Sequence, residues 1–432
     1  MKVGVISLGC PKNLTDTEAV LGLLVDSGYE LTNDQNKADI MIVNTCAFVG
    51  AARDEAFDII GEMTQLKSRG TLKFLVVTGC LPKRDKNELF DNYEGIDAIV
   101  GPGSIDRIIW VLKNLGKNKK ISLLEGTHCL FTHRTPKMKA TPKYWAYIKI
   151  ADGCSNRCSY CIVPKLRGSF RSRPVDSIVA EVRGLVKNGL KEAILIAQDT
   201  TMYGSDLYKK PSLHILCKEL AKIRGLEWIR IMYAHPAHVT DDLIGTIASE
   251  RKIVRYLDLP IQHACDRILS KMRRRISANE LGRLIQKLRR RIPGIAIRTS
   301  VIVGFPGETE KEFNELLSFV KEGRFERLGV FKYSREKGSS AAEMRGQISE
   351  RVKEIRFRKL MGLQRKISKE SLKKMTGRVI MVLADGETGR SYMDAPEIDG
   401  VVELDKKIQA GRIVPVRVTG AREYDLSGVV VT

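Results

Sequence analysis

The sequence contains no apolar run that approaches the length of a membrane span, so we expect no membrane among its partners. Its first residues, MKVGVIS, enter a strand-like pattern directly and lack the apolar core and cleavage site of a secretory leader. Nine cysteines in 432 residues do not form the pattern of a secreted disulfide scaffold. We therefore expect a cytoplasmic protein whose thiols stay reduced and can bind metal.

Acidic residues are in the minority, with 51 Asp and Glu against 73 Lys and Arg, and the formal net charge is +22. Such an excess is typical of a protein with a polyanionic partner, most often nucleic acid or a nucleoprotein. A generally basic soluble surface is the alternative. The length favours two or three domains over one.

A second cysteine pair of the kind that completes a zinc site is missing, yet three cysteines lie close together. Cys154, Cys158 and Cys161 have C-x-x-x-C-x-x-C spacing and follow an apolar, strand-like run at residues 144–151. Thiolates hold iron–sulfur clusters, and a cluster with four irons that receives three of them keeps one iron open. A structural zinc site without its fourth ligand, or a chance cluster, is the alternative.

Three further cysteines each follow a strand of an alternating strand–helix segment, which predicts a parallel sheet over residues 1–115. Cys10, Cys46 and Cys80 come after strand-like residues 3–8, 39–44 and 73–78. Because the ends of parallel strands share one edge, these thiols should converge and hold a second cluster with an open iron. Three unrelated buried cysteines are the alternative. The sequence from Thr15 to Glu18 also fits a capping box that opens the first helix.

Residues 144–336 alternate six strand candidates with helices, which predicts a partial (β/α)6 barrel. Capping boxes at residues 277–280 and 309–312 mark two of the helices. Chemistry in such barrels takes place where the strands end. The following residues should face that mouth: Cys154, Cys158, Cys161, Gln198, Asp199, Gln262, His263, Gly304, Gly307 and Glu308.

Residues 304–308 are either an ordinary Gly/Pro turn between a strand and a helix or a backbone edge that binds an adenine ring. Arg298 is either a structural ion-pair partner or a contact to a bound carboxylate or ribose. His235, His238 and His263 could move protons, although structural roles are the simpler interpretation. Three cysteines lie outside both sets: we expect Cys217 in the core, Cys265 near the mouth and Cys129 as a free thiol.

Basic residues gather in a linker at residues 117–143, in clusters at 271–275 and 287–291, and in a helical stretch at 350–374. These are solvated faces or contacts to RNA phosphates. From about residue 376, short β-branched runs separated by Asp, Gly and Pro predict a small β-barrel that serves as a binding module.

The chain resembles the methylthiotransferases of the radical S-adenosylmethionine (SAM) superfamily over nearly its whole length. The resemblance rests on residues 7–13 (SLGCPKN), 44–46 (NTC), 151–161 (ADGCSNRCSYC), 171–174 (RSRP), 197–204 (AQDTTMYG), 259–263 (LPIQH), 298–309 (RTSVIVGFPGET) and 394–400 (DAPEIDG). It favours the branch that modifies a ribosomal protein. The chain departs from the family pattern at residues 233–238 (YAHPAH) and at Lys337, where an acid is expected.

The resemblance implies an α/β architecture with a methylthiotransferase N-terminal domain (1–116), the basic linker (117–143), a radical SAM core (144–371) and a C-terminal TRAM β-barrel (372–432). It implies two [4Fe-4S] clusters. Cys154, Cys158 and Cys161 would hold the catalytic cluster, whose open iron chelates SAM, and Cys10, Cys46 and Cys80 the auxiliary one. Further SAM contacts would come from Gln198, Gln262, Arg298, Gly304, Gly307 and Glu308.

The implied reaction uses SAM twice, first as methyl donor to a sulfur at the auxiliary cluster and then as the source of a radical that activates the target carbon. The implied target is the β-carbon of an aspartate in small-subunit ribosomal protein twelve, with an electron-donor protein as a further partner and RNA contact through the basic helices and TRAM domain. Two alternatives remain: the same chemistry on a tRNA adenosine, and a non-catalytic iron–sulfur protein that binds RNA.

Overall fold

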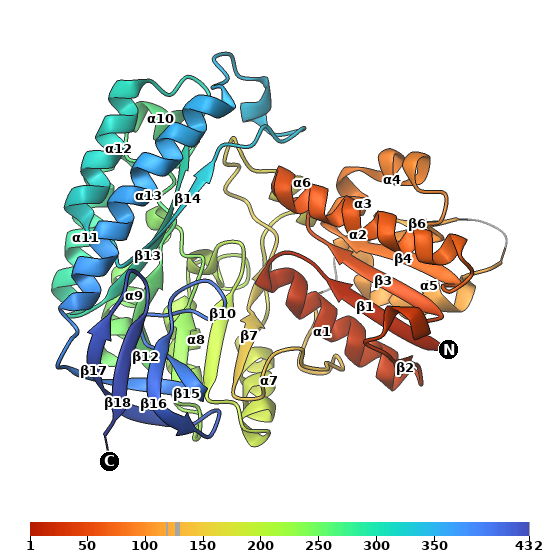
Figure 1. The fold of residues 1–432 in the computed structure, drawn as a ribbon, viewed down its shortest axis with the longest axis horizontal. Coiled ribbons are helices and arrows are strands. Elements are labelled where there is room, and N and C mark those ends of the chain that lie inside the picture. Colours follow the sequence, from red (N-terminus) through yellow and green to blue (C-terminus); the bar gives the residue numbers. More distant parts are fainter. Residues whose placement is uncertain (118–119, 126–129, 432) are drawn as a thin grey trace. The chain divides into compact units, whose positions relative to one another are not determined.

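The computed structural model of the chain describes residues 1–117, 120–125 and 130–431 (Figure 1). Cys129 lies outside the described residues. The chain forms two compact units. Unit 1 comprises Met1–Thr141, Ala151–Arg173 and Ser334–Ala342, and unit 2 comprises Pro142–Ile150, Pro174–Tyr333 and Glu343–Thr432.

Unit 1 is built on a parallel sheet with the strand order β2-β1-β3-β4-β5-β6, which confirms the predicted parallel sheet. Its strands are β1 (Lys2–Ser7), β2 (Glu30–Leu31), β3 (Ile40–Thr45), β4 (Phe74–Gly79), β5 (Ala98–Val100) and β6 (Ile121–Leu123). Its helices are α1 (Pro11–Asp26), η1 (Gln35–Lys37), α2 (Gly50–Ser68), α3 (Cys80–Arg84), α4 (Lys86–Asn92), η2 (Pro102–Arg107), α5 (Ile108–Asn114) and α6 (Val163–Arg167). β3 is buried at every position because apolar clusters cover both faces of the sheet. β6 lies within the stretch expected to be a linker.

Helix α1 begins earlier than the sequence pattern predicted, so the expected capping box is wrong. Cys10 is the N-cap and Pro11 occupies the first turn, where its missing N–H costs nothing. Thr15 and Glu18 therefore lie inside the helix. The Thr15 hydroxyl donates to the carbonyl of Lys12, and the Glu18 carboxylate accepts from the N–H of Ala140.

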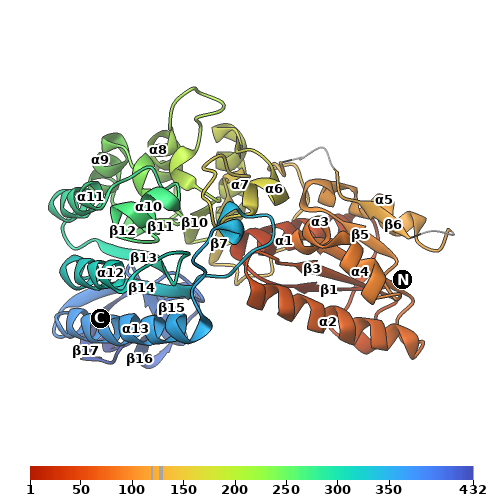
Figure 2. The same cartoon turned by 90° about the horizontal axis from the view of Figure 1, so that it is seen from above.

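Unit 2 contains a second parallel sheet, with the order β14-β13-β12-β11-β10-β7. Its strands are β7 (Trp145–Lys149), β10 (Glu192–Ile196), β11 (Trp228–Ile231), β12 (Ile253–Asp258), β13 (Ala296–Val303) and β14 (Arg327–Lys332). Its helices are α7 (Val175–Lys187), η3 (Thr200–Met202), α8 (Leu213–Ala221), η4 (Pro236–His238), α9 (Asp241–Ser249), α10 (Asp266–Lys271), α11 (Ala278–Arg291) and α12 (Glu310–Gly323). Helices α9, α11 and α12 line one side of the strands (Figure 2). Both predicted capping boxes are present, at the starts of α11 and α12.

Helix α13 (Glu350–Lys373) leads into four strands that close into the predicted small barrel. These are β15 (Val379–Ser391), β16 (Val402–Ile408), β17 (Ile413–Ala421) and β18 (Leu426–Val430). Most of the basic side chains of α13 are exposed, but Lys353 and Arg356 are buried. The helix therefore packs with two of its cations turned inward.

The segment at residues 390–399, which includes the last two residues of β15, docks onto the sheet of unit 2 through buried charges. Glu192, the first residue of β10, accepts hydrogen bonds from Arg230 at 2.7 Å and from Arg390 at 2.6 Å. Arg230 also donates to the carbonyls of Ser391 and Tyr392. Removing one partner of a fully buried pair leaves an uncompensated charge, which makes this anchor costly to break.

The same segment continues across the sheet with two acids. Asp394 pairs with Arg327, the first residue of β14. Asp399 accepts from the Tyr256 hydroxyl at 2.8 Å and lies 3.4 Å from the Arg298 guanidinium. The barrel is thus tied to the sheet where β10 and β14 begin, whereas the mouth is formed where the strands end.

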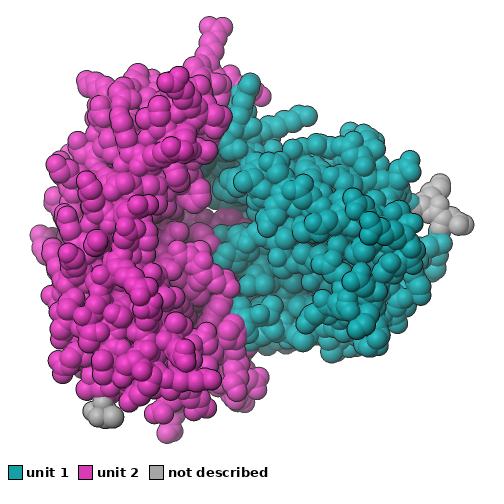
Figure 3. Space-filling model, viewed as in Figure 1, with its two compact units in different colours: residues 1–141, 151–173, 334–342 teal, residues 142–150, 174–333, 343–432 magenta. Residues whose placement is uncertain are grey.

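The cysteine loop, which we define as residues 151–173, belongs to unit 1 although it follows β7 in the chain (Figure 3). It contains the short strands β8 (Ala151–Asp152) and β9 (Arg171–Ser172), which pair with each other, and helix α6. The final 3-10 turn η5 (Ser340–Glu343) begins in unit 1. Among the described residues, every helix is too short or too polar to cross a membrane.

Replacing Glu192 with Ala should lower the midpoint of thermal unfolding by about 6 °C or more, because two buried guanidinium groups lose the carboxylate that pairs with them. Anaerobic calorimetry would measure the shift. The matched control is Glu219→Ala, which breaks the exposed pair with Lys222 and should shift the midpoint by about 2 °C or less. Equal shifts in the two variants would contradict the anchoring role of Glu192.

Candidate active site

The structure brings Cys10, Cys46 and Cys80 together, because they follow β1, β3 and β4, which are neighbours in the sheet. Gly9 and Gly79 precede two of them with φ values of +92° and +97°. A Cβ atom on Gly9 would lie 2.3 Å from Cβ of Cys46, and one on Gly79 would lie 2.4 Å from the carbonyl oxygen of Thr45. Glycine is required at both positions because the strand ends approach so closely.

Burial and neighbouring thiols oppose the ionisation of Cys46 and Cys80. Burial, and then the charges of Cys10 and Cys80, raise the pKa of Cys46 to about 12. Burial is also the main reason that the pKa of Cys80 is raised. Burial raises the pKa of Cys10 too, but the charges of Lys12 and Arg167, together with the backbone N–H groups of Asn13 and Lys12, bring the pKa below its usual value. Three sulfur donors that cannot readily carry three charges alone fit a positively charged metal cluster, which would stabilise all three thiolates.

Cys154, Cys158 and Cys161 lie in a tightly folded turn of the cysteine loop. Gly153 has φ = +79°, and a Cβ atom there would lie 2.1 Å from the carbonyl oxygen of Ser169. The N–H of Cys154 donates to Gly168, and the N–H of Val163 donates to Sγ of Cys161 at 3.4 Å. All three cysteines are half-buried. Such sulfurs, partly accessible and with an N–H directed at one of them, fit a cluster that must meet a ligand.

The predicted mouth residues of unit 2 follow the ends of the strands. Gln198 comes after β10 and is half-buried. Gln262 comes after β12 with φ = +69°, a strained value for glutamine, and its backbone pairs with β13. His263 is fully buried, and burial lowers its pKa to about 3, so it is neutral. The neutral ring accepts from the N–H of Cys265, which is a structural contact.

The loop at residues 304–308 is organised by Glu308. Its carboxylate accepts from the N–H groups of Gly304 at 2.7 Å and Phe305 at 3.1 Å, and from Arg356 at 2.9 Å. The N–H of Gly307 donates to Gly346. These three N–H groups therefore serve the fold of the loop. Burial raises the pKa of Glu308 to about 7, against the lowering effects of Arg356 and the two N–H groups.

Arg298 on β13 is paired inside unit 2, 3.0 Å from Asp258 and 3.4 Å from Asp399. The structure thus shows the structural ion pair, one of the two interpretations of the sequence.

Cys217 is fully buried, as expected for a core residue. Cys265 is buried as well, with its thiol 3.6 Å from Glu312.

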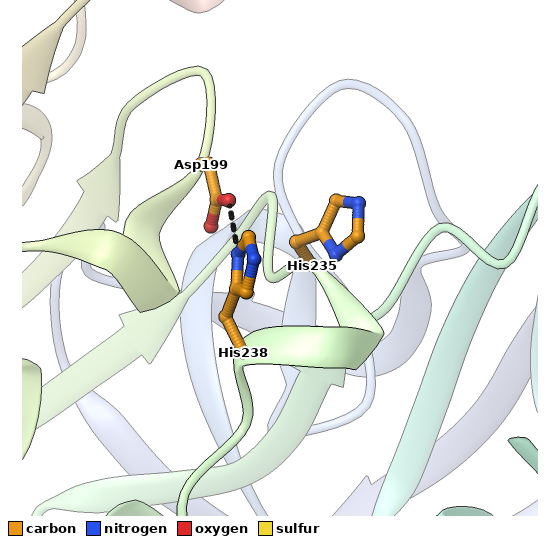
Figure 4. Close-up of side chains that lie close together, drawn as sticks. All are labelled: Asp199, His235 and His238. Atoms are coloured by element: carbon orange, nitrogen blue, oxygen red, sulfur yellow. Dashed lines mark hydrogen bonds and ion pairs between the residues drawn. The ribbon is translucent and has the colours of Figure 1, made fainter. Parts of the chain in front are cut away.

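Asp199, His235 and His238 form a compact polar cluster after β10 and β11 (Figure 4). Nδ1 of His238 lies 2.8 Å from the Asp199 carboxylate, and the two rings stack with centroids 4.5 Å apart. Thr201 donates to Asp199, and Nδ1 of His235 accepts from the N–H of Ala237. One nitrogen of each histidine is thus already hydrogen-bonded, and these contacts account for the approach of the three side chains without an ion.

Sequence reasoning missed Arg167, the last residue of α6. Its guanidinium is buried against Asn13, Asp16 and Asp152. The sequence gives one signal for it, the position six residues after Cys161 in a loop that must fold compactly. Its partners are far apart in the chain, so no spacing reveals them.

Family models divide the chain into three matches: "Uncharacterized protein family UPF0004" over residues 2–101, the radical SAM superfamily over 148–320 and the TRAM domain over 376–431. Among solved structures, the radical SAM methyltransferase TsrM from Kitasatospora setae has the same fold, with a TM-score of 0.58 at 15% identity over 89% of this chain and 79% of that chain. The cobalamin-dependent SAM radical enzyme OxsB matches with a TM-score of 0.53 at 14% identity over 85% and 56%. The fold and the cysteine loop thus define a radical SAM enzyme, with SAM and an iron–sulfur cluster as cofactors, and the predicted fold class is confirmed.

Curated relatives narrow this class. The ribosomal protein uS12 methylthiotransferase RimO from Desulforamulus reducens is 47% identical over 99% of this chain and 98% of its own length. The protein of the same name from Geobacter sulfurreducens is 46% identical over 100% and 99%. The chain belongs to the RimO family of radical SAM methylthiotransferases.

Replacing Glu308 with Ala should weaken SAM binding at least tenfold, because it frees the N–H groups of Gly304 and Phe305 and leaves Arg356 without its buried partner. Isothermal calorimetry on the anaerobic protein would measure the dissociation constant. Glu322→Ala, an exposed change on α12, is the control and should leave the constant unchanged. An unaltered constant in the Glu308 variant would show that the loop keeps its shape without this carboxylate.

Proposed function

We propose that the protein transfers a methylthio group to the β-carbon of an aspartate in ribosomal protein uS12. The observation that carries the proposal is the identity of 46–47% to proteins of that name over essentially the whole chain. The two cysteine sets support it, because sulfur insertion into an unactivated C–H bond needs both a radical source and a sulfur carrier.

We propose two [4Fe-4S] clusters, one on Cys154, Cys158 and Cys161 and the other on Cys10, Cys46 and Cys80. When bound, the first supplies the electron that cleaves SAM, and the second carries the sulfur to be transferred. The tight turn at Gly153 and the N–H of Val163 hold the first set of thiolates. Gly9 and Gly79 allow the second set to converge.

In this proposal the mouth of the unit 2 sheet orients SAM. Gln198, Gln262, Gly304 and Gly307 contribute to that surface, and Glu308 fixes the loop that presents it. Arg298 contributes indirectly, because it pairs with Asp399 and with Asp258, the last residue of β12.

The charge of the protein fits a ribosomal setting. We propose that the TRAM barrel and the outer face of α13 contact ribosomal RNA while uS12 is modified in the cytoplasm, with a separate electron-donor protein. The exposed basic residues of α13 are Arg351, Arg358, Lys359, Arg365, Lys366, Lys369 and Lys373.

A strain that lacks the protein should lose methylthio-aspartate from uS12 and keep its tRNA modifications. Mass spectrometry of uS12 peptides and of digested tRNA measures both, and expression of the intact chain should restore the aspartate modification. Loss of a methylthio-adenosine with an unchanged uS12 would replace this function with the tRNA activity.

The two-cluster assignment predicts different losses from two triple variants. Replacing Cys154, Cys158 and Cys161 with Ala should leave about four irons per chain and abolish SAM cleavage. Replacing Cys10, Cys46 and Cys80 should also leave about four irons, but should keep SAM cleavage while sulfur insertion is lost. Iron analysis and chromatography of 5′-deoxyadenosine provide the measurements. Full sulfur insertion by the second variant would refute the auxiliary site.

A further inference from the structure

One buried cation connects the segments that carry the two cysteine sets. Arg167 lies in unit 1 with only 5% of its surface exposed, at the end of the helix that follows Cys161. A fully desolvated guanidinium is costly unless its donors are satisfied by charged or polar partners. The residues that satisfy its donors therefore show which segments of unit 1 the arginine connects.

On one side Arg167 holds its own loop. Nη1 lies 3.2 Å from the Asp152 carboxylate, two residues before Cys154. Asp152 in turn accepts from the N–H of Gly153 and stands on β8, which pairs with β9. The guanidinium therefore ties the end of α6 to the residues that enter the cysteine loop, and these residues pair with the residues that leave it.

On the other side Arg167 holds the N-terminal strand ends. Nη2 donates to Asn13 at 2.6 Å, and Nη1 donates to Asp16 at 3.0 Å. The Asn13 amide donates to the carbonyls of Leu8 and Thr45, each at the end of a strand that leads to a cysteine. Asn13 and Asp16 both stand on α1, whose N-cap is Cys10.

The charge of Arg167 also lies close to the N-terminal cysteines, because Asn13 and Asp16, to which it donates, stand in the first two turns of the helix that Cys10 caps. With Asp16 and Asp152 it forms a buried group of formal charge −1. Without the arginine, the two carboxylates would leave −2 next to the thiolates. The reduction potential of an iron–sulfur cluster depends on the net charge around it, and added negative charge makes reduction harder.

We propose that Arg167 is a positioning residue that fixes the cysteine loop against the strand ends carrying Cys10 and Cys46, and that its charge raises the reduction potential of the auxiliary cluster. The inference rests on the proposed function only in that Cys10, Cys46 and Cys80 hold a cluster. The arginine is required because a lysine has a single ammonium group and cannot hold Asn13, Asp16 and Asp152 in one plane.

The test uses the full-length chain with both clusters reconstituted, and it measures the potential of the cluster that does not respond to SAM by EPR-monitored titration. In Arg167→Met, the ratio of reduced to oxidised auxiliary cluster at a fixed potential should fall at least tenfold, a shift of about 59 mV for one electron. In Arg167→Lys the potential should stay near that of the unaltered protein. Hydrogen exchange of amides 152–167 should be faster in both variants.

The matched control is Arg230, an equally buried arginine paired with Glu192 in unit 2. Arg230→Met should lower the unfolding temperature but change neither the potential nor the exchange of amides 152–167. The double variant Asp16→Asn with Arg167→Met restores the buried charge of −1 and should return the potential toward its original value. A structural defect alone would not be corrected in this way.

An Arg167→Met protein whose potential and exchange match those of Arg230→Met would overturn the inference and leave the proposed function intact. So would a double variant that stays as far shifted as Arg167→Met. If the reconstituted protein without substitutions contains only about four irons per chain, both the two-cluster proposal and this inference are overturned before any variant is compared.

Discussion

Parallel strands that end at one edge of a sheet impose the constraint on which this protein depends. In unit 1 that edge gathers Cys10, Cys46 and Cys80 from three neighbouring strands, across some seventy residues of sequence. In unit 2 the same geometry places Gln198 after β10, Gln262 after β12 and the Glu308 loop after β13. The approach is close enough that Gly9 and Gly79 can carry no side chain, so backbone crowding is part of how the sulfurs are collected.

The features that follow from this constraint could be predicted from the sequence. Alternating strands and helices, with a cysteine after each of three strands, were sufficient to place the N-terminal cysteines together, because strand ends in a parallel sheet are neighbours whatever lies between them. The six-stranded sheet, the capping boxes of α11 and α12 and the terminal barrel also followed from local patterns. In each case the pattern that predicts the element lies within a few neighbouring residues.

Features that depend on long-range partners could not be predicted. One error was local: α1 begins at Pro11, four residues before the capping pattern that was taken for its start. The role of Glu308 depended on Arg356, which comes from α13. Arg298 had two open interpretations until Asp258 and Asp399 were seen beside it. Arg167 gave no periodic signal, because its partners lie in α1 and β8. For Glu308, Arg298 and Arg167, a buried charge is explained by a residue that no spacing rule connects to it.

The anchor between the terminal barrel and the unit 2 sheet has a consequence for how the chain is made. Glu192 meets Arg390 across 198 residues of sequence, and Asp394 and Asp399 complete the pairing of Arg327 and Tyr256. During synthesis, when domains generally fold from the N-terminus onward, these strands emerge long before their counter-charges. The central sheet therefore reaches its final state only after residues 390–399 have been made, so its completion waits for the segment that leads through the small barrel.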